Sequence, residues 1–86
     1  MLRYLLVISD PTKVDVIGER VTTKFPAADV RKGGSTYWFI RSDLDTRQIT
    51  DTLFDTSKPP ETNFVIARMD AWWGWNDKSL WEWLSG

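Results

Sequence analysis

Hydrophobic and polar positions along the chain predict four strands and two helices before residue 70. The N-terminal stretch, residues 2–9, is almost continuously apolar, which is typical of a central strand covered on both faces. A helix is predicted next, because apolar side chains recur every three or four positions: Val14, Ile17, Val21 and Phe25. Thr12, followed three residues later by Asp15, resembles a capping box at the start of this helix, and Pro26 ends it.

The middle of the chain predicts a hairpin followed by a second helix. A short polar strand at residues 29–31 and an aromatic strand at residues 36–41 flank a glycine turn. Asp45 and Gln48 have the spacing of a capping box, so a helix is predicted from this point to about Asp55.

After a proline-containing loop, residues 63–70 return to a strand pattern. The predicted order is therefore strand, helix, strand, strand, helix, strand. This βαββαβ order is the signature of the ferredoxin-like α+β fold, a four-stranded antiparallel sheet with two helices on one face. A Trp-rich C-terminal extension, residues 70–86, completes the chain, with Asn76 and Asp77 as the expected cap of a short helix at residues 78–84.

The chain contains no cysteine and no histidine. Disulfides, thiolate catalysis, zinc-finger sites and Ser-His-Asp triads are therefore excluded. Acid–base catalysis would need a carboxylate, lysine or tyrosine with a shifted pKa, so this composition makes an enzyme less expected than a binding protein. A magnesium ion held by one or two aspartates and by waters is compatible with this composition.

Length and charge narrow the class of protein further. A chain of 86 residues is too short for a second independent core, so one domain, 1–86, is expected. Lysine and arginine number 11 against 12 acidic residues, for a net charge of −1, which lowers the expectation of nucleic-acid binding. The apolar run at residues 4–8 is too short to span a bilayer and no signal-peptide cleavage site follows it, so a cytoplasmic protein without a membrane partner is expected.

Tryptophan is concentrated at the C-terminal end, where five of the six tryptophans fall within the last fifteen residues. Three interpretations are open: a hydrophobic plug for a small core, an interface with a second copy or another protein, or a platform on which bases or sugars stack. If the strand continued, Trp72 and Trp73 would point to opposite faces, so at least one is expected to be exposed or covered by a partner. The predicted binding residues are Trp72, Trp73, Trp75 and Trp81.

Several segments resemble those of small bacterial proteins called SinR-like. They are Val7-Ile8-Ser9-Asp10 at the end of the first strand, the aromatic strand at 36–40, and the ending with Val65-Ile66-Ala67-Arg68, Trp72, Gly74, Trp83 and Leu84. The resemblance implies a relation in fold to the small ferredoxin-fold CRISPR-associated nucleases and to the virulence-associated protein D family. Those families dimerise through their sheets, so the resemblance implies a homodimer.

Asp10 carries two alternative interpretations. It matches the position where the CRISPR-associated family is thought to hold a metal with one aspartate from each subunit, which would make Asp10 a catalytic magnesium ligand. No tyrosine precedes it, however, and Pro11 follows it directly. An aspartate before a proline at the start of a helix is also a favoured turn and cap residue. Magnesium is expected only under the nuclease alternative, and otherwise no cofactor is expected.

Four basic residues are candidate contacts to a phosphate backbone, provided that they line one face or edge of the sheet: Arg31, Lys32, Arg41 and Arg68. Charges at a sheet edge also prevent aggregation, which is the simpler explanation. The sequence therefore predicts a homodimer that acts by binding another macromolecule, with a protein as the expected partner, through its Trp-rich segment. A metal-dependent endonuclease is the alternative, and whether the tail packs within one chain or across two is left open.

Overall fold

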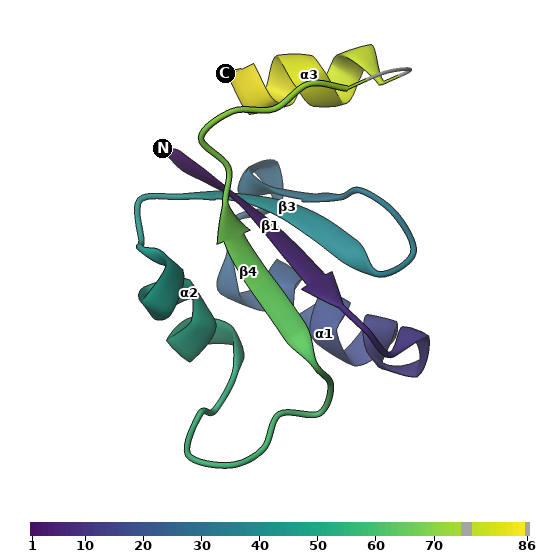
Figure 1. The fold of residues 1–86 in the computed structure, drawn as a ribbon, viewed down its shortest axis with the longest axis vertical. Coiled ribbons are helices and arrows are strands. Elements are labelled where there is room, and N and C mark those ends of the chain that lie inside the picture. Colours follow the sequence, from purple (N-terminus) through teal and green to yellow (C-terminus); the bar gives the residue numbers. More distant parts are fainter. Residues whose placement is uncertain (75–76, 86) are drawn as a thin grey trace.

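The computed structural model describes residues 1–74 and 77–85, which form an α+β structure with a four-stranded antiparallel sheet and three helices (Figure 1). The strands are β1 (Leu2–Ile8), β2 (Val30–Lys32), β3 (Tyr37–Ser42) and β4 (Phe64–Arg68). The helices are α1 (Val14–Lys24), α2 (Thr46–Leu53) and α3 (Lys78–Ser85), and short 3-10 turns occupy Pro11–Lys13 and Ala27–Asp29. The strand order is β2-β3-β1-β4, which is compatible with the predicted ferredoxin-like class.

The first strand, β1, is central, as its apolar sequence predicts, because it pairs with β3 on one side and with β4 on the other. Residues directly opposite one another in antiparallel strands point to the same face. We call the face covered by α1 and α2 the helix face; its buried sheet residues are Tyr4, Leu6, Ile8, Trp38 and Ile40. The two helices contribute fully or almost fully buried side chains to the same core: Ile17, Val21, Ile49 and Leu53.

The opposite side of the sheet, here called the tail face, carries α3. Its residues on β1, β2 and β3 are Arg3, Leu5, Val7, Arg31, Tyr37, Phe39 and Arg41. Phe39 forms a second hydrophobic cluster with Leu80 and Leu84 of α3. Figure 1 shows α3 at the end of the molecule where β1 begins and β4 ends. The sheet therefore separates two small cores, one on each face.

Capping interactions explain where the helices begin. The predicted capping box of α2 is confirmed, because Asp45 accepts a hydrogen bond from the Gln48 backbone while the Gln48 side chain accepts one from the Asp45 backbone. The predicted cap at Thr12 is wrong. Asp10 instead caps the 3-10 turn that Pro11 begins, and Thr12 is the residue that donates to it.

The predicted C-terminal helix forms one residue longer than expected, as α3. Asp77 caps it, since an Asp77 carboxylate oxygen accepts a hydrogen bond from the Leu80 backbone N–H at 3.1 Å. Asn76, the other residue expected at this cap, lies outside the described residues.

Candidate functional site

The segment after β4 folds back onto the tail face of its own chain. The Met69 backbone N–H donates to the Arg3 carbonyl at 2.8 Å, and Met69 then packs into the second hydrophobic cluster. The half-buried Trp72 lies with its ring centre 5.6 Å from the Arg3 guanidinium carbon, a cation–π contact. Gly74 passes close to Trp81, and a Cβ at position 74 would lie 1.8 Å from the indole ring. This part of the tail is therefore a plug within one chain.

Arginines from the sheet hold both ends of α3. At its start, the Arg31 guanidinium lies 3.5 Å from a carboxylate oxygen of Asp77 and donates a hydrogen bond of 2.6 Å to the Ser79 hydroxyl. At its end, Arg3 donates to the Leu84 carbonyl. Carbonyls in the last turn of a helix lack intrahelical partners and carry partial negative charge, so a cation there is favourable.

Arg41 is more deeply placed than Arg31, with 17% of its side chain exposed against 32%. It donates to the carbonyls of Trp83 at 3.1 Å and Ala28 at 2.8 Å, and lies 3.3 Å from an Asp29 carboxylate oxygen. Its guanidinium carbon also stacks 4.4 Å from the Trp83 ring centre. One side chain thus joins β3, the turn before β2 and the end of α3.

The four predicted phosphate contacts do not share a face. Arg31 and Arg41 point to the tail face and are engaged with α3. Lys32 lies opposite Trp38 in the register, which places it on the helix face at the β2 edge. Arg68, opposite Tyr4, lies on the helix face at the β4 edge, where its side chain pairs with Asp70 at 2.8 Å. These four residues therefore do not form one continuous basic surface.

Asp10 acts as a cap in the structure. One carboxylate oxygen accepts hydrogen bonds from the Thr12 backbone N–H at 2.9 Å and from the Thr12 hydroxyl at 2.7 Å. These hydrogen bonds lower the pKa of the Asp10 carboxyl below its usual value. Within residues 1–74 and 77–85, no group of three or more acidic side chains is placed to hold a metal ion. A paired-aspartate site would require Asp10 from a second copy.

The predicted tryptophans divide between the core and the surface. Trp72 and Trp81 are half-buried and pack against the cluster of Phe39, Leu80 and Leu84. Trp73 is 84% exposed, which confirms that at least one of the neighbouring pair Trp72 and Trp73 is not buried by its own chain. Trp75 lies outside the described residues.

Part of the tail face remains uncovered by α3. Val7 pairs with Tyr37 on one side and with Val65 on the other, so the three residues form one row across β3, β1 and β4. Tyr37 is 36% exposed and Val65 is 61% exposed. We call Tyr37, Val7 and Val65 the open row. The sequence pattern did not single it out, although Val65 stands at an alternate position to the core-facing Phe64 and Ile66.

A separate anchor holds the loop between α2 and β4. Arg20 of α1 donates to the Leu53 carbonyl at the end of α2, and its second nitrogen lies 2.5 Å from a Glu61 carboxylate oxygen. The rings of Phe54 and Phe64, one at each end of this loop, stack with their centres 3.9 Å apart. The Arg20 guanidinium carbon lies 5.8 Å from the centre of the Phe54 ring. The hydrogen bond from Arg20 is the main cause that lowers the pKa of Glu61 from its usual 4.5 to about 2.

The Arg20–Glu61 pair predicts a specific dependence of stability on pH. Because the pKa of Glu61 is lower in the folded state, the pair stabilises the fold above about pH 4.5, and this contribution disappears as the pH falls toward about 2. Glu61 is 39% exposed, so solvent screening reduces the effect, and Glu61→Gln is expected to cost about 1 kcal/mol at pH 7. Urea unfolding at pH 7 and pH 3 measures this.

At pH 3 the difference in unfolding free energy between Glu61→Gln and the wild type should be smaller than at pH 7. Asp51→Asn is the matched control, since Asp51 forms an exposed pair with Arg47 one helical turn away. Equal effects of the two substitutions at pH 7 would contradict an anchoring role for Glu61.

No model of a known protein family matches the chain, and no curated protein matches it. The resemblance to SinR-like proteins therefore stays a prediction from the segments in which it was seen. Among the residues described, no helix combines the length and the apolar character needed to cross a membrane.

Proposed function

We propose that this chain is a ferredoxin-like domain with a Trp-rich C-terminal extension, and that it functions as a homodimer that binds another protein. The observation that carries the proposal is Trp73, which is 84% exposed, whereas Trp72 and Trp81 pack against the second hydrophobic cluster. A tryptophan offers about 150–250 Å² of contact surface, and exposed aromatic side chains of this size are typical anchors of interfaces.

The size of a stable interface indicates that Trp73 does not act alone. Stable protein interfaces cover roughly 800 Å² on each partner, which is about a seventh of the 5497 Å² surface of this chain. The open row supplies further apolar surface on the tail face, next to β4, which is an edge strand of the sheet. We propose that Trp73 and the open row both belong to the docking surface.

We propose a second copy of the chain as the occupant of this surface, so Trp73 and the open row support the homodimer, whereas the binding of another protein is proposed from the sequence. The net charge of −1 gives two copies little electrostatic reason to repel one another. An exposed edge strand is also a common template for pairing between chains. The sequence resemblance supports the same assembly, because the families related in fold to SinR-like proteins dimerise through their sheets.

Trp73→Ala is expected to weaken the dimer by about 30-fold, which corresponds to an interface anchor of about 2 kcal/mol. Light scattering across a concentration series measures the dimer dissociation constant. The matched control is Val16→Ala, because Val16 is another exposed apolar residue, 47% exposed, but lies on α1. Circular dichroism should show both variants folded.

Two results would contradict the proposal. One is a wild-type protein that stays monomeric at every concentration tested. The other is a dimer whose dissociation constant is the same in Trp73→Ala as in Val16→Ala. In the second case a dimer exists but assembles through a different surface.

A further inference from the structure

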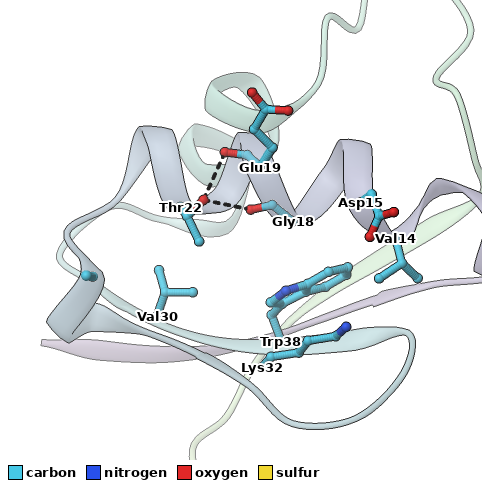
Figure 2. Close-up of a pocket in the computed structure, with 9 residues that line it drawn as sticks. Val14, Asp15, Gly18, Glu19, Thr22, Val30, Lys32 and Trp38 are labelled. Carbon is cyan, nitrogen blue, oxygen red and sulfur yellow. Dashed lines mark hydrogen bonds between the residues drawn. The ribbon is translucent and has the colours of Figure 1, made fainter.

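A cavity of about 400 Å³ lies between α1 and the β2 edge of the sheet, on the side of the molecule away from the tail face. Figure 2 shows its walls: α1 above, β2 and Trp38 below. Cavities of this size are at the lower end of those that bind small molecules. The cavity is separate from Trp73 and from the open row, so a ligand bound in it would be independent of the proposed function.

The floor of the cavity presents a hydrogen-bond donor without a partner. Trp38 is only 2% exposed, yet its indole N–H makes no hydrogen bond within the described part of the chain. The Trp38 nitrogen is not fully buried. Among the described residues, Arg41 Nε alone is a side-chain nitrogen or oxygen that is both fully buried and without a hydrogen-bond partner. Figure 2 shows the nitrogen side of the indole facing the space between Gly18, Thr22 and Val30. Because no protein group among the residues described accepts from this N–H, the donor is available to a ligand that enters the cavity.

The surroundings of this donor are apolar. Thr22 lines the cavity from α1, but its hydroxyl donates back to its own helix, with the Gly18 carbonyl at 3.0 Å and the Glu19 carbonyl at 3.1 Å as shared acceptors. The methyl groups of Ala27 and Val30 complete the inner wall. A group that fits here is flat, mostly apolar and carries an acceptor such as an amide carbonyl.

The outer rim of the cavity has an excess of negative charge. Asp15 and Glu19, one helical turn apart on α1, have no ion-pair partner within the described ranges. One cation, the ammonium of Lys32, lies at the rim, 6.0 Å from the centre of the Trp38 ring. Two carboxylates against one ammonium favour a ligand whose outer end is positively charged.

We propose that this cavity binds small aromatic amides that carry a cationic amine, with the amide carbonyl accepting the Trp38 N–H and the amine facing Asp15 and Glu19. The carbonyl satisfies the one unpaired donor on the floor, and the ring lies between α1 and β2. The amine remains at the rim, where water reaches it, so its charge is not buried.

The probe for this site is 4-(aminomethyl)benzamide, added to ¹⁵N-labelled protein while the indole N–H resonances are followed by NMR. The Trp38 resonance is assigned from its own side chain by triple-resonance experiments. It is expected to move to lower field as the carbonyl binds. Benzylamine, which lacks the carbonyl, should bind about threefold to tenfold more weakly. The 4-carboxybenzamide anion, of similar size and opposite charge, should also bind more weakly than the probe.

Two neighbouring alanines provide the matched variants. Ala27→Leu places a larger side chain in the cavity and is expected to abolish the shift, whereas Ala28→Leu lies outside the lining and should leave it unchanged. Thr22→Leu narrows the same space from α1 and serves as a second blocking variant. Ala27 and Thr22 are exposed, so both blocking variants should fold.

The proposal is overturned if the Trp38 indole resonance does not move up to the solubility limit of the probe. It is also overturned if both blocking variants show the same shift as the wild type. Equal binding of the probe and of 4-carboxybenzamide would overturn the assignment of a cationic ligand.

Discussion

Leu84→Ala is expected to lower the free energy of unfolding by about 2–4 kcal/mol, the largest effect predicted for the tail. Leu84, on α3, is fully buried in the cluster with Leu80 and Phe39, so its truncation removes apolar contacts and leaves a cavity. Alanine is a good helix former, and the loss therefore reports packing and not helix propensity. Urea unfolding followed by tryptophan fluorescence measures it, because Trp81 and Trp83 flank the same cluster.

The control for Leu84→Ala is Glu82→Ala in the same helix. Glu82 is exposed, and its contact with Lys78 is a surface pair at 3.8 Å, so this variant should stay within about 0.5 kcal/mol of the wild type. If both variants unfold at the same urea concentration, α3 does not belong to the cooperatively folded structure.

Arg41→Met is expected to cost about 2–3 kcal/mol, because it removes charged hydrogen bonds and leaves the partly buried Asp29 without its cation. Methionine keeps much of the length and apolar surface of the side chain, so the loss reports the guanidinium. Arg41→Lys is expected to recover only part of the stability, since an ammonium does not reproduce the planar fan of donors that reaches Trp83 and Ala28.

Arg47→Met is the matched control for Arg41→Met. Arg47 pairs with Asp51 on the surface of α2, where its side chain is 77% exposed, and its replacement should change stability by less than about 0.5 kcal/mol. The same urea experiment measures both variants. An equal loss of unfolding free energy in both variants would show that the contacts of Arg41 with α3 stabilise the fold no more than an exposed surface ion pair does.

Local signals in the sequence predicted the elements well, because they depend on residues a few positions apart. The capping box of Asp45 and Gln48 is present as expected. The cap before α1 was misplaced because Asp10 and Thr12 are both suitable caps; Asp10 caps the 3-10 turn, and α1 itself begins at Val14 without a side-chain cap. Pro11 decided between them, because its fixed φ angle favours the first turn directly after Asp10.

The packing of the tail could not be predicted in the same way. The contact of Arg3 with Leu84 joins residues 81 apart, and that of Arg41 with Trp83 joins residues 42 apart. Such contacts depend on strand register, which decides that Arg31 and Arg41 face α3 while Lys32 faces the other side. Sequence alone therefore presented these arginines as candidate ligands for phosphate, whereas two of them hold a helix.

The distribution of the anchors of α3 also constrains the order in which the chain folds. Arg3, Arg31 and Arg41 lie on β1, β2 and β3, so the docking site for α3 exists only after these three strands have paired. Closing contacts over such long stretches of chain is slow compared with forming a local helix. We therefore expect the tail to assemble last, and its amide protons to exchange with solvent through partial openings that leave β1 protected.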